Sequence, residues 1–307
     1  MTRISSAMIP AASLADIARA QQQLVEAARQ SSAQTKANDL KGYGREAQTL
    51  VSAQRLVARN QGFQATAREL ATRMQLQDVA LGRAADAISK LKDALFQNLS
   101  LESGEGVRSQ LEEAFAVVKD TMNTNIGGRY LFGGVRNDQA PVKAVSLSGL
   151  ATDPLTNSLE QGADVQIMRV EEGRTIPAGV VADDVITQAL SSIKRLAETD
   201  EGPDGPFGGD LTDAQKQAIT DELTALGDAF TTILAQQAEN GRLSKDVDAA
   251  TTRLTSQYNA LDEAIGGITD VDLAEVAVRL NQAQFAYESS ASIFNTLRGL
   301  SLLNVLK

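Results

Sequence analysis

Two runs of apolar residues with heptad spacing, one near each end of the chain, constrain the fold more than any other feature. Near the N-terminus the seam consists of Ile4, Ala7, Ala11, Leu14, Ala18, Val25 and Ala28. Alternating steps of three and four residues place side chains along one face of a helix, so we expect a helix from about residue 9 to residue 31. Because this seam is rich in alanine and buries little area, the helix would be marginal alone and needs a partner.

The same spacing returns toward the C-terminus, where Asp270 or Asp272 is expected to start the last helix. Its seam consists of Leu273, Val276, Leu280, Ala283, Tyr287, Ser290, Phe294 and Leu297. The apolar pattern continues through Leu300 and Leu303, although a chain end is normally the least ordered part of a protein. We therefore predict that Met8–Ala28 and Leu273–Leu306 pair within one subunit and also pack on copies of the chain. The predicted assembly interface is Ile4, Ala11, Leu14, Ala18, Val25, Leu273, Val276, Leu280, Tyr287, Phe294, Leu297, Leu300 and Leu303.

Longer helices are predicted between these two seams. Apolar residues recur at two heptad positions up to about Leu99, which predicts one long helix. The first position holds Leu56, Phe63, Leu70, Ala84 and Leu91, with Gln77 as the exception. The second holds Ala67, Met74, Leu81, Ile88 and Leu95. A break at Ser100–Gly106 precedes a shorter helix at 107–122, which should fold back antiparallel. Helices are also expected at 183–196 and from an N-cap at Thr212 to about Ile265, where Gly266 and Gly267 should break the chain.

The helical period disappears in the middle of the chain. Aromatic and β-favouring residues lie between paired glycines at 127–134, and apolar residues alternate at Val142–Val145 and Val165–Val170. These patterns predict short strands between turns. The glycine-rich segment is not a phosphate-binding loop, because no Gly-Lys-Ser/Thr follows it. An insert this small should pack against the helices.

Together these patterns predict a mainly α fold, a long antiparallel coiled-coil-like helical bundle with a small inserted β subdomain and paired N- and C-terminal helices. We expect a terminal coiled-coil assembly domain of residues 1–40 and 270–307. A helical rod domain would comprise 41–134 and 182–269, and a small β-rich outer domain 135–181.

Composition argues against most other classes of protein. The chain has no cysteine and no histidine, so it lacks a thiol nucleophile, thiolate metal ligands and the commonest general base. Its net charge of −10 disfavours nucleic acid and anionic membrane as partners. We expect no enzyme activity, no cofactor and no metal. A hydrolase or metal-binding protein stays the distant alternative, because Asp183–Asp184 and Asp246–Asp248 fall in helical patterns and lack a calcium-loop sequence.

No signal-peptide pattern and no apolar run long enough to span a membrane occurs in the sequence. These facts fit a cytoplasmic protein. They equally permit export by a machine that does not cleave a signal.

The residues resemble the flagellin superfamily. The segment Asn-Ile-Gly-Gly-Arg-Tyr-Leu-Phe-Gly-Gly is similar to the Gly-Arg-Tyr-Leu-Phe-x-Gly segment of hook-filament junction proteins, the third hook-associated protein of bacterial flagella. In this chain the motif residues are Gly128, Arg129, Tyr130, Leu131, Phe132 and Gly134. The segment Ile268–Leu306 is similar too, with Asp270-Val271-Asp272-Leu273 at its start and Leu300-Ser301-Leu302-Leu303 near its end. The β insert has no match.

One segment departs from the junction-protein pattern. After the first helix the family usually has Ser-Gly-Lys and an acidic, proline-containing turn, whereas this chain has Asp39-Leu40-Lys41-Gly42-Tyr43-Gly44. That variant resembles flagellin-like proteins of α-proteobacteria. It makes the assignment to the junction proteins less specific, and a filament-forming flagellin stays the alternative. A coiled-coil adhesin fits the composition but not the motif.

The resemblance implies a structural flagellar subunit located outside the cell and exported unfolded without a cleaved signal peptide. Its implied partners are copies of itself, a hook-side junction protein, flagellin, an export chaperone and the flagellar export apparatus. It also implies terminal helices that order and pair only in the assembled tube.

Overall fold

The computed structural model describes residues 8–160 and 164–305. The chain divides into two compact units, and each is mainly helical. Unit 1 combines Met1–Arg59 with Tyr258–Lys307, and unit 2 is Asn60–Gln257. The predicted fold class, a bundle of long helices with a small β subdomain and paired terminal helices, is confirmed.

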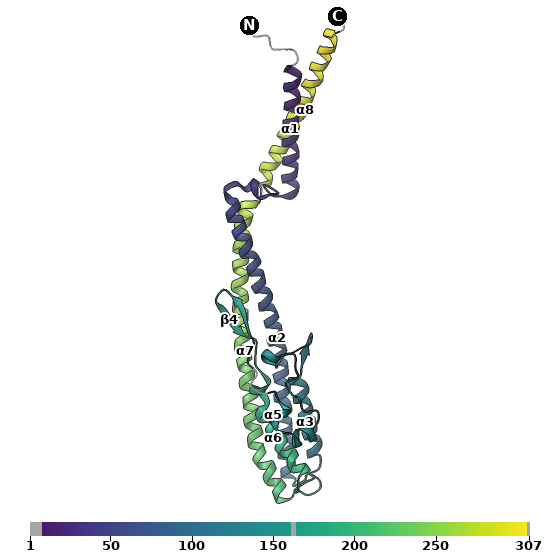
Figure 1. Cartoon of the computed structure of the whole chain (residues 1–307), viewed down its shortest axis with the longest axis vertical. Coiled ribbons are helices and arrows are strands. Elements are labelled where there is room, and N and C mark those ends of the chain that lie inside the picture. The colour runs from purple at the N-terminus through teal and green to yellow at the C-terminus, as the bar shows by residue number, and fades with distance from the viewer. Residues whose placement is uncertain (1–7, 161–163, 306–307) are drawn as a thin grey trace. The chain divides into compact units, whose positions relative to one another are not determined.

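Unit 1 contains the two terminal helices, which pack side by side (Figure 1). They are α1 (Met8–Ala33) and α8 (Leu273–Val305). A short 3-10 helix, η1 (Leu40–Glu46), follows α1. Unit 1 also holds the start of α2 (Ala47–Ser100) and the end of α7 (Asp213–Thr269).

Unit 2 contains the remaining parts of α2 and α7 together with α3 (Val107–Met122) and α6 (Ala182–Glu201). Between α3 and α6 the chain forms two antiparallel hairpins, β1 (Asn125–Ile126) with β2 (Arg129–Tyr130), and β3 (Ile167–Glu171) with β4 (Arg174–Pro177). Three short helices lie between the hairpins: η2 (Gly134–Arg136), α4 (Leu147–Thr152) and α5 (Leu155–Ser158).

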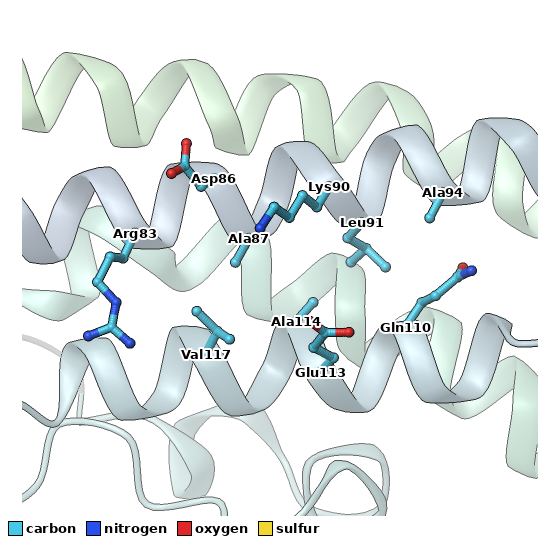
Figure 2. A pocket seen from close by; sticks show the side chains of 10 residues that line it. All are labelled: Arg83, Asp86, Ala87, Lys90, Leu91, Ala94, Gln110, Glu113, Ala114 and Val117. Atoms are coloured by element: carbon cyan, nitrogen blue, oxygen red, sulfur yellow. The ribbon is translucent and has the colours of Figure 1, made fainter.

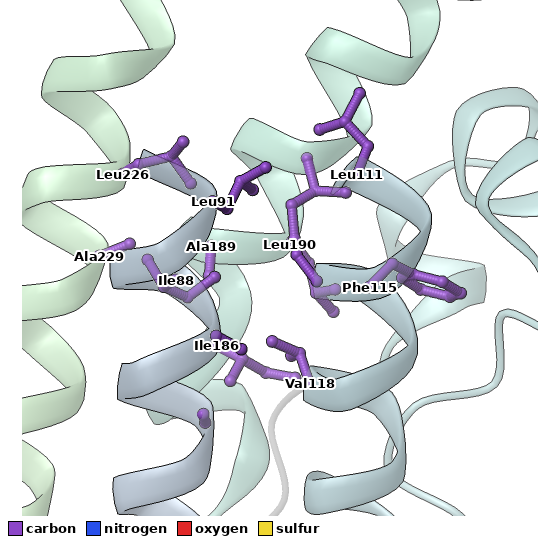
Figure 3. Close-up of a cluster of buried hydrophobic side chains, with 14 of the residues drawn as sticks. Ile88, Leu91, Leu111, Phe115, Val118, Ile186, Ala189, Leu190, Leu226 and Ala229 are labelled. Atoms are coloured by element: carbon purple, nitrogen blue, oxygen red, sulfur yellow. The ribbon is translucent and has the colours of Figure 1, made fainter. Parts of the chain in front are cut away.

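The core of unit 2 is formed by four helices. Figure 3 shows branched and aromatic side chains from α2, α3, α6 and α7 meeting in one cluster. Ile88, Leu111, Val118, Ile186 and Leu226 are each fully buried in it. The predicted heptad residues from Leu81 to Leu95 belong to this cluster, and those from Phe63 to Met74 pack in a second cluster with α7 and the β3–β4 hairpin. Leu56, predicted in the same stripe, is 42% exposed in unit 1.

The predicted start of α7 is confirmed by a reciprocal pair of hydrogen bonds. Gln215 N donates to Thr212 Oγ1 (3.2 Å), and Thr212 N donates to Gln215 Oε1 (3.1 Å). Such a capping box satisfies donors that the first helical turn leaves free. Asp272 caps α8 in a similar way, accepting from Ala274 N at 2.8 Å.

The predicted break at Gly266–Gly267 is wrong, because α7 continues to Thr269. Lys36 Nζ donates to the carbonyl oxygens of Gly267 (3.1 Å) and Ile268 (2.8 Å). A cation at a helix C-terminus satisfies carbonyls that have no helical partner. The glycines therefore lie inside a helix whose end is stabilised from another part of unit 1.

The strand predicted at Val142–Val145 is also wrong, although the one predicted at Val165–Val170 forms β3. Only Val142 makes an isolated bridge, with Leu159, and helix α4 follows. Ser146 Oγ accepts from Gly149 N (3.1 Å) at the start of α4. At its end, Lys194 Nζ donates to the carbonyl of Ala151 at 2.7 Å. Within the predicted strand itself, Val142 N donates to Asn123 Oδ1 (2.9 Å) and Asn123 Nδ2 donates to Val142 O (2.8 Å), so a side chain satisfies the backbone groups that a neighbouring strand would have paired.

Gln77, the polar exception in the α2 heptads, fixes the central insert to α2. Its side chain is fully buried, and Nε2 donates to the carbonyls of Leu131 (2.8 Å) and Val180 (3.1 Å). Gly179, with a φ of +93°, lies against this amide so closely that a Cβ would come within 1.6 Å of Gln77 Oε1. A buried amide with partners on two separate segments specifies how those segments pack.

Candidate assembly interface

The contact between α1 and α8 is made by small side chains. On α1 the buried residues are Ala20 (5% exposed) and Ala27 (6%), and Ile17 and Leu24 are half-buried. On α8, Val276 and Ala283 are buried. Small residues let two helices approach closely, but they remove little apolar area from water. The pair is therefore well defined in geometry and weak in hydrophobic stabilisation.

The predicted C-terminal seam contacts α1 over most of its described length. Val276 is buried, and Leu280, Tyr287 and Phe294 are half-buried, whereas Leu273 at the start of the helix is 48% exposed. The backbone of Leu297, Leu300 and Leu303 belongs to α8, but their side chains lie outside the described residues.

The predicted N-terminal seam lies on the exposed side of α1. Leu14 is 53% exposed and Val25 is 62% exposed, and Ala11 and Ala18 are exposed as well. The stripe that packs on α8 is displaced by one residue, which corresponds to a turn of about 100° around the helix. Ile4 of this seam lies outside the described residues. Helix α1 thus carries two apolar stripes, and α8 covers only one of them.

Helix α8 also presents apolar side chains that no seam predicted. Val278 is 55% exposed, Phe285 is 73% exposed and Ile293 is 57% exposed. The sequence could have indicated these exposed residues only through the apolar side chains that occur all around the helix and not along one face. A helix that is apolar on several sides is normally covered on several sides.

A polar groove of about 560 Å³ runs between α1 and α8 within unit 1. Its lining includes Arg19, Gln23 and Glu26 from α1 and Arg279 and Gln282 from α8. Helical geometry places Leu14, Ala18 and Val25 about 120° around α1 from the groove residues Arg19, Gln23 and Glu26. The hydrogen bonds from Arg29 hold the pKa of the Glu26 carboxyl below its usual range, so the polar side keeps its charges.

The connections next to the two helices are joined by hydrogen bonds to backbone oxygens. Lys36 N donates to Thr269 O (2.8 Å), and Thr35 forms an isolated antiparallel bridge with Asp270. Arg29 Nη2 donates to Lys36 O at 2.9 Å. These bonds fix where α1 ends relative to where α8 begins, and so fix the two helices antiparallel.

The glycine-aromatic motif has a packing role within unit 2. Leu131 and Phe132 are buried, whereas Gly128 and Arg129 are exposed on the β1–β2 hairpin, where Tyr130 is half-buried. Ala182 N donates to Phe132 O (3.0 Å), which joins the motif to the start of α6. Gly134 has a φ of +56°, and a Cβ there would lie 2.3 Å from Asp164 O. These contacts explain why the motif needs glycine and apolar residues without invoking a ligand.

The acidic clusters form no candidate metal centre. Among residues 8–160 and 164–305, no group of three or more acidic side chains could hold a metal ion. Arg242 Nη1 donates to Asp246 (3.0 Å), and Asp183 Oδ1 accepts from Thr187 Oγ1 (2.6 Å). In the same described part of the chain, every helix is too short or too polar to cross a membrane.

Comparisons with known proteins point to one superfamily. Residues 223–306 match the family model of the bacterial flagellin C-terminal helical region. A putative flagellar hook-associated protein from Vibrio parahaemolyticus has a similar structure, with a TM-score of 0.60, 16% identity, and coverage of 73% of this chain and 97% of that chain. Bacillus cereus FlgL gives a TM-score of 0.56 at 15% identity, covering 70% and 99%. No curated protein matches by sequence.

The predicted resemblance to the flagellin superfamily is thus supported, directly by sequence in the C-terminal arm and at the level of fold over most of the chain. The matched C-terminal region includes all of the predicted C-terminal seam.

Proposed function

We propose that the chain is a structural subunit of the bacterial flagellum that joins hook to filament and assembles with copies of itself. The observation that carries this proposal is the uncovered apolar stripe of Leu14, Ala18 and Val25 on α1 beside a weakly buried α1–α8 contact. Covering a Leu or Val side chain contributes about 1.5–3 kcal/mol, so assembly would supply the burial that unit 1 lacks. The terminal domain, residues 1–40 and 270–307, would then form the tube.

The hook-filament junction is favoured over a filament-forming flagellin because the two solved structures described above are a putative flagellar hook-associated protein and FlgL. The Gly-Arg-Tyr-Leu-Phe segment supports the same choice. In this proposal the chain acts outside the cell, and its partners are a hook-side junction protein, flagellin, an export chaperone and the flagellar export apparatus. The chain would carry no enzyme activity.

Deletion of the gene in the source bacterium tests the junction role. We expect a hook without a filament, with flagellin lost to the medium, and recovery of motility when the intact gene is returned. A filament that still forms in the deletion strain would contradict the junction role. Growth of long filaments from the purified protein alone would favour a flagellin instead.

Substitutions on α1 test the stripe itself. Leu14→Glu with Val25→Glu should leave the monomer folded, since both side chains are exposed there, and should abolish assembly and complementation. Arg19→Gln with Gln23→Glu, on the polar groove side of the same helix, changes the charge by the same amount and is the matched control. Equal loss of assembly in both variants would argue against a specific role for the stripe.

Truncation of Leu297–Lys307 provides an independent test of the C-terminal seam. We expect a soluble, folded monomer that cannot assemble. An unfolded truncated protein would place the end of the seam in the monomer's own core.

A further inference from the structure

A groove of about 360 Å³ lies between α2 and α3 within unit 2 (Figure 2). Its floor is formed by small side chains, Ala87 and Ala94 on α2 and Ala114 on α3, which leave the space between the two helices open. Arg83 and Lys90 of α2 stand along it, one heptad apart. In the described part of the chain neither cation has an ion pair, so both are free to meet carboxylates from outside.

The groove continues along the same face of α2 beyond the alanines. Leu76 is 37% exposed and Val79 is 59% exposed, and both fall on the helical face that carries Arg83 and Lys90. At the other end, Gln110 Oε1 is buried without a hydrogen-bond partner within the described residues. The face therefore combines uncovered apolar side chains, unpaired cations and an unsatisfied acceptor, together with two acids of its own, Asp86 and Glu113.

The outer face of α7, also in unit 2, has the complementary features. It lies opposite the buried residues Ile219, Leu226 and Ile233, and its exposed side chains are Asp221, Thr224, Asp228, Thr231, Ala235 and Ala238. The two aspartates are one heptad apart, as are Arg83 and Lys90. Asp221 accepts one hydrogen bond, from Gln217 at 2.8 Å, and Asp228 has no ion pair in the described chain. The remaining residues form a narrow ridge of small side chains.

An antiparallel alignment brings the two faces into register over more than two heptads. When Arg83 is opposite Asp228, Lys90 falls opposite Asp221 and Leu76 opposite Ala235. Asp86 of the groove then meets Ala225 instead of another acid. Two cations, two carboxylates and an apolar pair thus match through a single alignment of heptad positions.

We propose that this groove takes the outer face of α7 from a second copy of the chain. The contact is heterologous, because groove and ridge are different surfaces of one molecule, and such contacts build rings or helical tubes instead of closed pairs. This inference rests on the proposed self-assembly and adds to it an interface within unit 2.

Charge reversal tests the pairing. Arg83→Glu with Lys90→Glu alters the groove, and Asp221→Lys with Asp228→Lys alters the ridge. Each variant alone should raise the concentration needed for half-association roughly tenfold or more, since like charges would face each other. Because each variant retains one original surface, a mixture of the two should recover association, as should the variant with all four changes. Asp248→Lys, elsewhere on α7, should have no such effect.

A disulfide test reports the contact itself and is independent of motility. The chain has no cysteine, so Leu76→Cys and Ala235→Cys can each be introduced singly and the two proteins mixed under oxidation. A cross-linked heterodimer is expected. The matched control mixes Leu76→Cys with Asp248→Cys, an exposed position elsewhere on α7, and should give no cross-link.

Absence of the Leu76–Ala235 cross-link at concentrations where the wild type associates would overturn the inference, as would failure of the mixed charge variants to recover association. A wild type that never associates would overturn it too. Loss of the junction role in cells, with the cross-link retained, would instead refute the proposed function and leave this contact standing.

Discussion

Unit 1 and unit 2 are both built from long helices, but they differ in what those helices bury. Unit 2 encloses Leu, Ile, Phe and Met side chains from four helices, such as Leu81, Ile88 and Phe115. The apolar side chains buried in the described part of unit 1 are mostly alanines: Ala20, Ala27, Leu50, Ala53, Val276 and Ala283. At the same time unit 1 leaves Leu14, Val25 and Phe285 more than half exposed.

This difference teaches that the two units obtain their stability from different sources. Hydrophobic stabilisation grows with the apolar area removed from water, so we expect unit 2 to fold by itself. Unit 1 has a fixed geometry but little burial, so its helices should become stable only when copies cover their outer stripes. A unit that is stable alone and a unit that needs covering are what the proposed export and assembly of the chain would require.

The largest difference in stability between variants should appear when one apolar side chain is shortened in unit 2 and, in a separate variant, one in unit 1. Ile88→Ala in the core of unit 2 should lower the free energy of unfolding by about 2–5 kcal/mol, because it leaves a cavity. Leu14→Ala on the exposed stripe of unit 1 should change it by less than about 0.5 kcal/mol and should weaken assembly instead. Urea unfolding and sedimentation measure the two quantities. Comparable destabilisation by both variants would remove the distinction between the units.

A second effect concerns the attachment of the insert in unit 2. Gly179→Ala should lower the free energy of unfolding by about 2–4 kcal/mol, since the added Cβ would collide with Gln77 at a positive φ. Gly173→Ala is the control, because its φ is +71° and no atom lies within 4 Å of the added Cβ. It should cost only about 1–2 kcal/mol. Equal losses in thermal or urea unfolding would show that Gln77 does not fix the insert.

A smaller loss of stability is expected at the C-terminal end of α7, which lies in unit 1. Lys36→Met removes the hydrogen bonds to the carbonyls of Gly267 and Ile268 and should cost about 0.5–2 kcal/mol locally. Faster amide exchange at the end of α7 would report it. Lys41→Met, an exposed lysine after α1, should leave that exchange unchanged.

The smallest effect should be a pH dependence in unit 2. The hydrogen bond from Lys216 holds the pKa of the Glu102 carboxyl below its usual value. A carboxyl with a lowered pKa in the folded state contributes stability above its unfolded pKa of about 4.3, and this contribution is lost as pH falls through the folded value. Stability should therefore be flat near neutral pH and drop slightly in acid. Glu102→Gln should flatten that part of the profile, and an unchanged profile would contradict the assignment.

The heptads and caps made most of the helices predictable from the sequence. Thr212 and Asp272 begin helices because their side chains accept hydrogen bonds from free backbone donors nearby in sequence. The errors arose where distant residues decide the outcome. Lys36 binds the end of α7 beyond Gly266 and Gly267. In the segment Val142–Val145, the side chain of Asn123 pairs with both backbone groups of Val142 in place of a neighbouring strand.

The candidate interface was only partly predictable for a related reason. Heptad spacing shows that α1 has an apolar face, but α1 carries two such stripes about 100° apart, and spacing alone does not tell which one α8 covers. The exposed residues Val278 and Phe285 follow no single seam. The pairing of Gln77 with Leu131 and Val180 joins segments far apart in sequence, and only the fold brings them together.

Hydrogen exchange of the full chain, followed residue by residue in the monomer and in the assembled state, tests the central claim most directly. We expect slow exchange in the core helices of unit 2 in both states, since their opening requires global unfolding. Helices α1 and α8 should exchange fast in the monomer and become protected on assembly. Equal protection of both units in the monomer, or no gain of protection in α1 and α8 on assembly, would contradict the account.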